Sequence, residues 1–217
     1  MLNQTFLDHA HLIQIKVNTV LPQRQHCAEA LHDLIVSVRE GLDAGHKHYL
    51  KYRSVEQLQE HLEKGNLVFA AVSPQGKLIA CALMSDLSDV STMDFNAEHY
   101  GAENLAEGNW AIHTVGVHPD HVGNKLMARL LASIKTFVKE DPTRFSTLIS
   151  KVADTNRPSR ANFKAAGFEE LSGGYDAKGY DYTRFALNVS PRLAPELEMD
   201  LNTSYVTDLA RPVAFGS

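Results

Sequence analysis

This sequence has few cysteines, no long apolar run and no excess of basic charge. Only two of its 217 residues are cysteines, Cys27 and Cys81, and both stand among apolar neighbours. This pattern favours buried free thiols in a reducing compartment over a disulfide framework, and a single bridge is the alternative. No apolar run reaches the ~20 residues that cross a bilayer, and no signal peptide is visible at the start. We therefore expect a cytoplasmic protein with no membrane partner.

The charge balance is slightly acidic, with 21 Lys and Arg against 26 Asp and Glu and a formal net charge of −5. A chain without an overall basic surface is a poor candidate for binding nucleic acid or an anionic membrane. The apolar fraction of 44 % and the charged fraction of 22 % are those of an ordinary globular protein. A chain of this length can bury a sizeable core as one domain without a disulfide or a metal.

Metal-binding motifs are missing as well. Eleven histidines is a high count, and His9 with His11 and His46 with His48 have His-x-His spacing. A metal site needs three or four convergent ligands, usually with cysteine or carboxylate among them, and neither HExxH nor CxxC occurs. We interpret these histidines as surface residues and predict no metal site.

Hydrophobic periodicity predicts one domain over residues 1–189 and a proline-containing tail over 190–217. The expected order of elements is β-α-α-β-β-β-α-β-α-β-β, with hairpins first and crossover units second. That order predicts an α/β (α+β) fold with a mixed sheet and helices on both faces. The stretch 85–108 is long, polar and acidic, which is typical of a functional or a disordered loop. The expected strands are 12–17, 67–72, 77–84, 110–117, 145–152, 168–171 and 180–189, and the expected helices lie between Pro22 and Gly41, between Ser54 and Gly65, from about 123 to 140, and over 158–166.

The most informative segment is 110–131, which reads W-A-I-H-T-V-G-V-H-P-D-H-V-G-N-K-L-M-A-R-L-L. A buried strand leads into a turn with Pro119, then into Gly123 and the start of a long amphipathic helix. Unpaired backbone N–H groups and the positive end of the helix dipole make such a junction suitable for a pyrophosphate. Plain α/β structure contains the same junction, so this segment alone does not decide the function.

A second segment, 156–168, reads N-R-P-S-R-A-N-F-K-A-A-G-F. Together, in this order and about 30 residues apart, the two segments resemble the GNAT superfamily of acyl-CoA-dependent N-acyltransferases. The family pattern V-H-P-x-x-R-G-x-G-x-G is similar to 117–127 here, and the pattern N-x-x-A/S-x-x-x-Y/F-x-x-x-G-F is similar to 156–168. The matching positions are Val117, His118, Pro119 and Gly123 in the first, and Asn156, Ser159, Phe163, Gly167 and Phe168 in the second.

The resemblance covers roughly residues 12–189 and implies a GNAT-like, mostly antiparallel central sheet. It implies an enzyme that transfers an acyl group, with acetyl-CoA as the expected co-substrate, to a primary amine of a small molecule or a peptide. By the same resemblance, residues 115–117 of the expected strand 110–117 pair with pantetheine and supply an amide to the oxyanion. The implied coenzyme-binding residues are Val115, Gly116, Val117, Val122, Gly123, Asn124, Lys125, Leu126, Met127, Asn156, Ser159 and Phe163.

This chain departs from the family pattern at four of these positions. Val122 replaces the usual Arg or Gln, and Lys125 and Met127 replace two glycines that let backbone approach phosphate closely. Backbone amides remain at all of them, so an anion cradle can survive. Phe163 replaces the common Tyr, the general acid of the family, and it can pack on pantetheine but cannot donate a proton.

Candidate catalytic residues follow from the need to deprotonate the amine. His113 lies two residues before Val115, so we expect the two side chains to share a face of the strand, and a histidine suits a base at neutral pH. An ordinary half-buried strand histidine is the other interpretation. Glu107 and Asp94 are weaker candidates for the base. Tyr180, with Tyr175 and Tyr182 beside it, is the candidate that could replace the missing acid or stack on a substrate; strand packing is the other interpretation.

Two further hypotheses compete with an active enzyme. One is a degenerate GNAT fold that binds acyl-CoA or a partner protein without turnover, and the other is an unrelated α/β protein. Acidic residues in the 85–108 loop favour a cationic acceptor, and sheet edges suggest a homodimer. These acidic residues are Asp86, Asp89, Asp94, Glu98, Glu103 and Glu107.

Overall fold

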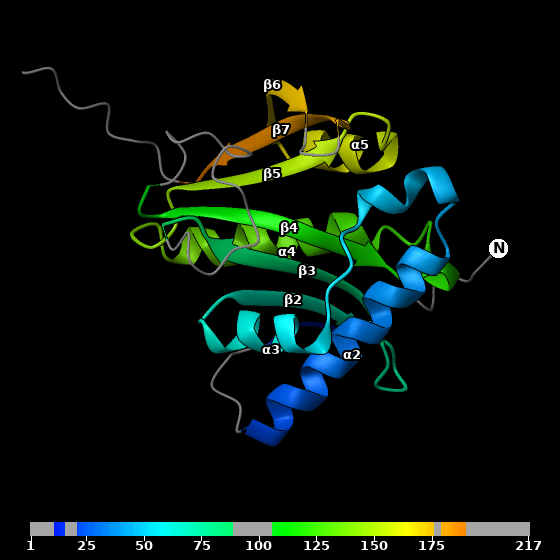
Figure 1. The fold of residues 1–217 in the computed structure, drawn as a ribbon. Helices are drawn as coiled ribbons and strands as arrows, with labels where there is room; N and C mark the ends of the chain where they lie inside the picture. The colour runs from blue at the N-terminus through cyan, green and yellow to red at the C-terminus, as the bar shows by residue number, and fades with distance from the viewer. Residues whose placement is uncertain (1–10, 16–20, 89–105, 176–178, 190–217) are drawn as a thin grey trace, which may run out of the picture.

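The computed structural model describes residues 11–15, 21–88, 106–175 and 179–189. They form one seven-stranded sheet in the order β1-β2-β3-β4-β5-β7-β6 (Figure 1). The strands are β1 His11–Ile15, β2 Leu67–Val72, β3 Leu78–Asp86, β4 Asn109–Val117, β5 Thr147–Ala153, β6 Glu169–Tyr175 and β7 Asp181–Asn188. The helices are α2 Leu21–Glu40, α3 Val55–Glu63, α4 Leu126–Glu140 and α5 Arg157–Ala165, with 3-10 turns η1 Ala44–Tyr49 and η5 Pro119–His121.

The sheet is antiparallel except where β4 runs parallel to β5. The β2–β3 hairpin turns at Gly76, whose φ of +78° is in the region that favours glycine. The parallel pair is joined by α4, because parallel neighbours require a crossover connection. The predicted mixed, mostly antiparallel α/β fold is confirmed.

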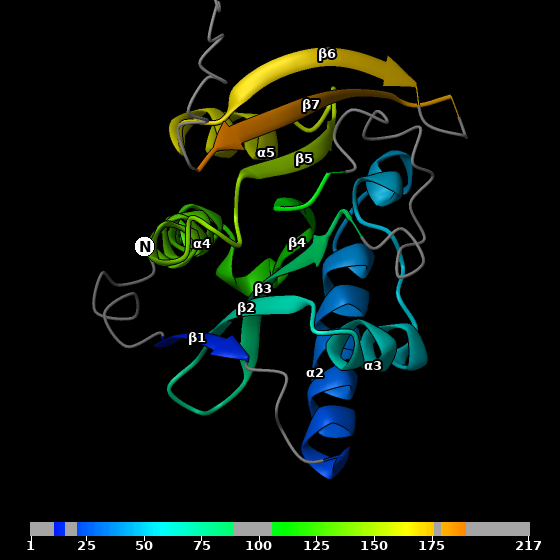
Figure 2. The same cartoon turned by 90° about the vertical axis from the view of Figure 1, so that its left-hand side faces the viewer.

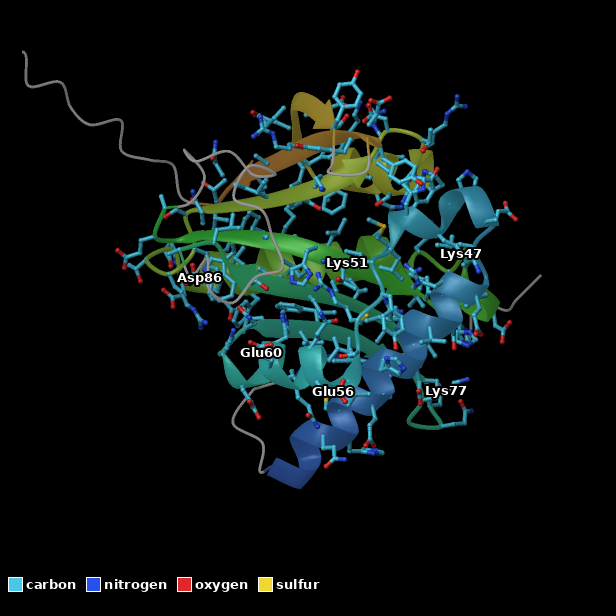
Figure 3. All side chains as sticks on the ribbon, viewed as in Figure 1. Lys47, Lys51, Glu56, Glu60, Lys77 and Asp86 are labelled. Carbon is cyan, nitrogen blue, oxygen red and sulfur yellow. The ribbon has the colours of Figure 1, made fainter. Side chains whose placement is uncertain are left out.

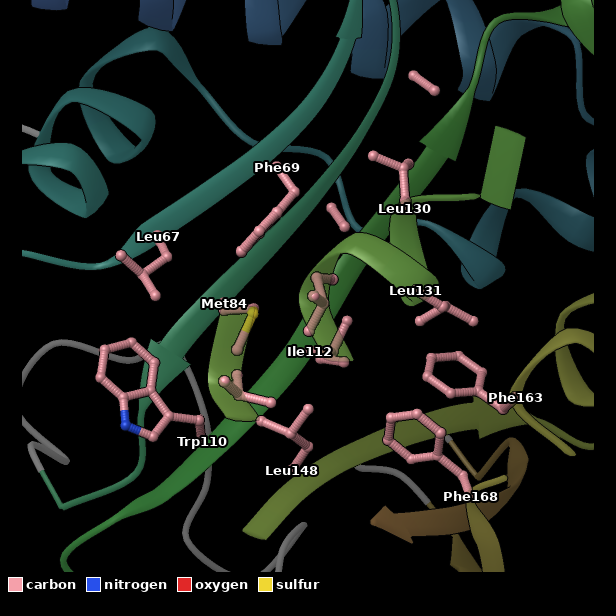
Figure 4. Close-up of a cluster of buried hydrophobic side chains, with 14 of the residues drawn as sticks. Leu67, Phe69, Met84, Trp110, Ile112, Leu130, Leu131, Leu148, Phe163 and Phe168 are labelled. Atoms are coloured by element: carbon pink, nitrogen blue, oxygen red, sulfur yellow. The ribbon is translucent and has the colours of Figure 1, made fainter. Parts of the chain in front are cut away.

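Helices cover both faces of the sheet, as predicted (Figure 2). α2 and α3 pack on one face over Val68, Cys81 and Leu83, and α4 and α5 pack on the other. α4 buries one stripe of its surface at helical spacing, and Figure 4 shows Leu130 and Leu131 of this stripe beside Ile112. The buried stripe is Leu126, Leu130, Leu131, Ile134 and Val138.

Element order agrees with the periodicity throughout, but one boundary differs for a clear reason. α4 starts at Leu126 rather than near Gly123. Gly123 has a φ of +88° and Lys125 a φ of 56°, and left-handed residues cannot belong to a right-handed helix. The 3-10 turn η1 was not predicted, whereas η5 lies at the turn that was predicted around Pro119. Most of the 85–108 loop and the whole 190–217 tail lie outside the described residues.

Both cysteines are free thiols. Cys81 is fully buried in β3, and burial raises the pKa of its thiol to about 12. Cys27 is half-buried on α2. Among the described helices, none is both long enough and apolar enough to span a bilayer.

Truncating Leu130 tests the packing of α4. Leu130 is fully buried, so Leu130→Ala is expected to lower the free energy of unfolding by about 3 kcal/mol, through lost burial and the cavity left behind. Val122 is 68 % exposed, and Val122→Ala is the control, expected to change stability by less than about 0.5 kcal/mol. Urea denaturation of both variants measures this, and equal effects would contradict the packing described.

Candidate functional site

The connection from β4 to α4 is a short loop with a defined shape. His118 starts η5, and its side chain accepts a hydrogen bond from the Asp120 N–H. The Val122 N–H donates to the Pro119 carbonyl. At Gly123 the backbone has positive φ, and a Cβ added there would meet nothing within 4 Å. The glycine is therefore required by backbone conformation, and the space beside it is open.

The N-terminus of α4 faces this open space without a side-chain cap. Lys125 occupies the N-cap position, and its side chain makes no capping hydrogen bond. The first-turn N–H groups, which include those of Leu126 and Met127, have no intrahelical acceptor. Nearby, the Asn124 side-chain nitrogen is buried without a hydrogen-bond partner among the described residues. Uncapped amides, a donor amide and the helix dipole fit a pyrophosphate group.

β4 and β5 pair over only part of their length. The ladder runs from Asn109↔Thr147 to Ile112↔Ser150, where the Ser150 hydroxyl also donates to the Ile112 carbonyl at 2.8 Å. Beyond this pair β4 continues to Val117 and β5 to Ala153, but their ladder does not. The predicted pantetheine-binding residues 115–117 therefore lie on the stretch of β4 that β5 does not pair, where an extended ligand can add to the strand edge.

A β-bulge in β4 overturns one prediction about His113. Leu83 pairs with Thr114 and the next residue, Met84, pairs with Ile112, so His113 is an extra residue in β4. The insertion shifts the alternation of side chains by one. Val115 consequently packs in the core cluster under α4, as Ile112 does, whereas His113 points to the opposite face. The expectation that His113 and Val115 share a face is wrong for this reason.

On that opposite face, His113 belongs to a cluster contributed by three elements. Its Nε2 lies 2.9 Å from the Ser85 hydroxyl of β3, and the same hydroxyl lies 3.5 Å from Nδ1 of His61 on α3. The two imidazole rings meet edge to face with centroids 5.4 Å apart. Nδ1 of His113 lies 3.1 Å from the Thr114 hydroxyl. Lys51, labelled in Figure 3, lies on the segment between η1 and α3 and contributes positive charge to this site.

Burial keeps both imidazoles of this cluster neutral. Desolvation lowers the pKa of His61 to about 4, and the charge of Arg53 acts in the same direction. Desolvation also lowers the pKa of His113 well below its usual range, helped by His61, Arg53 and Lys51. At neutral pH the His113 ring is therefore neutral, with one N–H and one nitrogen that holds a lone pair.

The second motif lies against the first. The Asn156 side chain caps α5 by accepting from the Ser159 N–H at 3.2 Å. The Ser159 hydroxyl lies 3.9 Å from the sulfur of Met127 in the first turn of α4. The structure thus brings the two predicted coenzyme-binding segments together at the start of α4 and α5.

Phe163 lies apart from this surface. It is 1 % exposed, stacks on Phe185 with centroids 5.7 Å apart and meets Phe168 edge to face at 5.0 Å (Figure 4). Its ring fills the core between α5 and the sheet. A role for Phe163 against pantetheine stays a prediction.

The remaining candidates are dispersed. Tyr180 is 42 % exposed and stacks on His48 of η1, with centroids 3.9 Å apart and planes 7° apart. Tyr182 is buried, with the Lys151 ammonium 4.5 Å from its ring centroid, and Tyr175 is 74 % exposed. Glu107 is exposed. Asp94, with Asp89, Glu98 and Glu103, lies outside the described residues.

Sequence reasoning missed His61 and Ser85. Ser85 precedes His113 by 28 residues and follows His61 by 24, so no local motif connects the three. The available signal was a histidine on the buried side of an amphipathic helix, next to Leu58 and Leu62. Among the described residues, no group of three or more His, Cys, Asp or Glu side chains is placed to hold a metal ion.

Comparison with known proteins identifies the family to which the chain belongs. The model of the acetyltransferase (GNAT) family matches residues 29–168, which is more than half of the chain. The protein therefore belongs to the GNAT acetyltransferase family. No curated protein matches the sequence.

Solved GNAT structures share the fold at low sequence identity. The ribosomal-protein-S18-alanine N-acetyltransferase of Escherichia coli aligns with a TM-score of 0.57 and 16 % identity, over 83 % of this chain and 95 % of that one. An acetyltransferase from Salmonella typhimurium with its cofactor acetyl-CoA gives 0.56 and 15 %, over 86 % and 98 %. A mutant form of the spermidine/spermine N-acetyltransferase of Vibrio cholerae gives 0.55 and 14 %, over 84 % and 95 %.

Stability should depend on pH through the two buried imidazoles. Well above pH 6.5 both the folded and the unfolded chain hold them neutral. As the pH falls below 6.5, the unfolded chain takes up protons that the folded chain excludes, so the free energy of unfolding falls. With a folded pKa of about 4, His61 alone should account for a loss of about 1.5 kcal/mol between pH 6.5 and 5.

Urea denaturation across this range measures the loss in the wild type and in His61→Gln. Carboxylates stay largely ionised above pH 5, so they contribute little in this window. The variant is expected to show a shallower dependence on pH. An identical slope in both proteins would contradict a buried neutral His61.

Proposed function

We propose that this protein is an N-acyltransferase that transfers the acyl group of an acyl-CoA, acetyl-CoA in the first instance, to a primary amine of a small molecule or peptide. The observation that carries the proposal is the uncapped N-terminus of α4 directly beside the stretch of β4 that β5 leaves unpaired. An anion site next to a free strand edge suits a ligand with a pyrophosphate and an extended amide-containing arm. Pantetheine is such an arm.

The donor would be held by backbone more than by side chains. The N–H groups at the start of α4 and the open space at Gly123 support pyrophosphate binding despite the loss of two family glycines. Val115, Gly116 and Val117 would pair with pantetheine along the β4 edge. Asn156 and Ser159 border the same region through Met127. The residues proposed for pyrophosphate are Val122, Gly123, Asn124, Lys125, Leu126 and Met127.

In this proposal the acyl donor binds on one face of the sheet and the base lies on the other, because the bulge turns His113 away from α4. α4, with its anion site, covers one face, and His113 lies on the other. The donor arm therefore has to pass between β4 and β5, where their ladder ends. A thioester supplies an activated acyl carbon, which forms the new C–N bond with the amine as the C–S bond breaks.

His113 is the proposed base on the acceptor side. An ammonium has no lone pair for the attack, so a proton must leave the amine first. The neutral imidazole of His113 can take it up, directly or through water. The displaced thiolate is a tolerable leaving group, which lessens the consequence of having Phe163 at the position of the family acid. Tyr180 is the alternative acid, held at the β6–β7 turn by its stack on His48.

The acceptor would approach from the face that carries α2, α3 and η1. The related structures named above act, by their names, on spermidine or spermine and on a ribosomal-protein alanine. Both are amines, and they span the small-molecule and peptide classes that we propose here. A homodimer through the sheet edges β1 or β6 also stays a prediction.

One observation favours a second candidate, a GNAT fold that binds acyl-CoA without turnover. The ring at the position of the family acid, Phe163, is buried in the core and has no hydroxyl. Binding without thiol release across a panel of amines would select this candidate. Thiol release that depends on an amine would exclude it.

Acetyl-CoA binding by calorimetry is the first test. Gly123→Trp places a bulky ring in the open space beside the α4 N-terminus, and it should abolish binding that is micromolar in the wild type. Gly76→Trp is the matched control, because Gly76 has the same kind of φ and equally open surroundings in the β2–β3 turn. The control should bind normally. No wild-type binding up to millimolar acetyl-CoA or longer acyl-CoAs would refute the proposal.

Removal of His113 tests the base. His113→Ala is expected to lower kcat about 100-fold or more while acetyl-CoA still binds, because general-base catalysis contributes on that order. Thiol release with the best acceptor from an amine panel measures kcat, and calorimetry measures binding. Full activity of the variant would remove His113 from the mechanism and leave the amine to lose its proton elsewhere.

A further inference from the structure

The three polar side chains on the acceptor side of β4 constrain one another through a single hydroxyl. Ser85 Oγ lies within hydrogen-bonding distance of both His113 Nε2, at 2.9 Å, and His61 Nδ1, at 3.5 Å. Ser85 is 2 % exposed, so water does not easily replace either contact. A hydroxyl has one hydrogen and can donate it to only one of the two rings. The other ring must then donate to the hydroxyl oxygen.

The contact between His61 and the Leu67 carbonyl determines which ring donates its hydrogen to the Ser85 hydroxyl. His61 Nε2 lies 3.4 Å from the Leu67 carbonyl oxygen, which can only accept. The hydrogen of neutral His61 is therefore on Nε2, and its Nδ1 is a bare acceptor. Ser85 donates to this Nδ1 and accepts from His113, so the hydrogen of His113 is on Nε2. Its Nδ1 is then bare and accepts from the Thr114 hydroxyl at 3.1 Å.

We propose that Ser85 and His61 are positioning residues that hold His113 in the Nε2–H tautomer, which makes Nδ1 its basic nitrogen. The chemical purpose of this arrangement rests on the proposed function, whereas the tautomer itself is inferred from the hydrogen bonds alone. A histidine base works only if its unprotonated nitrogen faces the proton to be removed. In the Nε2–H tautomer the Nδ1 lone pair accepts from the Thr114 hydroxyl, so this hydroxyl would have to release the lone pair or relay the proton when His113 acts as a base.

The groups packed around His113 are consistent with a ring kept neutral in one tautomer. His61 faces it from α3, Ser85 from β3, and the cations Lys51 and Arg53 from the segment before α3. Positive charge on this side opposes protonation of His113. At neutral pH the ring therefore has one hydrogen to place, and Ser85 determines where it is placed.

Nitrogen NMR of the protein with 15N-labelled histidine tests the proposal without substrate or turnover. The shifts and couplings of Nδ1 and Nε2 distinguish the two neutral tautomers, and His113→Gln assigns the His113 signals by their loss. At pH 7 we expect His113 and His61 both in the Nε2–H form. A predominant Nδ1–H form of His113 in the wild type would overturn the proposal.

Variants test whether Ser85 is the cause. Ser85→Ala should convert the single His113 tautomer into a mixture, and Ser85→Thr, which keeps the hydroxyl, should restore it. Ser150→Ala is the matched control, because Ser150 is an equally buried serine whose hydroxyl donates to Ile112 next to His113. The control should leave the His113 spectrum unchanged. An unchanged spectrum in Ser85→Ala, or an equal change in Ser150→Ala, would refute the role of Ser85.

The same spectra keep this inference separate from the proposed function. If the tautomer is as expected but acetyl-CoA neither binds nor reacts, the acyltransferase proposal fails and the positioning of His113 stands. If amine acetylation is found but His113 has the opposite tautomer, the positioning fails and the enzyme stands. In an active enzyme, Ser85→Ala should lower kcat about 10-fold at unchanged KM, with recovery in Ser85→Thr.

Discussion

The extra residue at position 113 of β4 is the constraint on which the site depends. A strand alternates its side chains strictly between two faces, and one inserted residue exchanges the faces from that point on. Ile112 and Val115 can therefore both pack under α4, while His113 reaches the face of α2 and α3. The same strand ends in the loop to α4. One irregularity thus allows β4 to border the proposed anion site on one face and the imidazole cluster on the other.

The two faces differ in what they provide. Under α4, the family glycines are largely gone, and what remains is geometry: positive φ at Gly123 and Lys125, and a helix start with no side-chain cap. A helix N-terminus of this kind can attract an anion through backbone dipoles without a basic side chain. On the face covered by α3, the part-buried rings of His61 and His113 are neutral beside the cations Lys51 and Arg53. Each neutral ring has one N–H and one nitrogen lone pair, and the neighbouring cations oppose the uptake of a second proton.

The core adapts to the changed motif. A phenyl ring at position 163 packs with Phe168 and Phe185 in the core. Unpaired polar groups in such surroundings are costly. Position 163 therefore holds a core residue that has no proton to donate, so a proton donor would have to be another side chain. The stack of Tyr180 on His48 connects η1 to the β6–β7 turn and keeps a phenol on the acceptor side.

Local features of the chain determined the order of elements, the buried stripe of α4, the glycine turns and the two motifs at the starts of α4 and α5. These depend on backbone conformation and burial within a few residues, so periodicity and glycine positions reveal them. The face to which His113 points, the separation of β4 from β5 and the partnership with Ser85 and His61 were decided only by tertiary structure. Strand register depends on packing between segments more than 20 residues apart. A single bulge, which has no signature in local sequence, reverses any face assigned by counting residues.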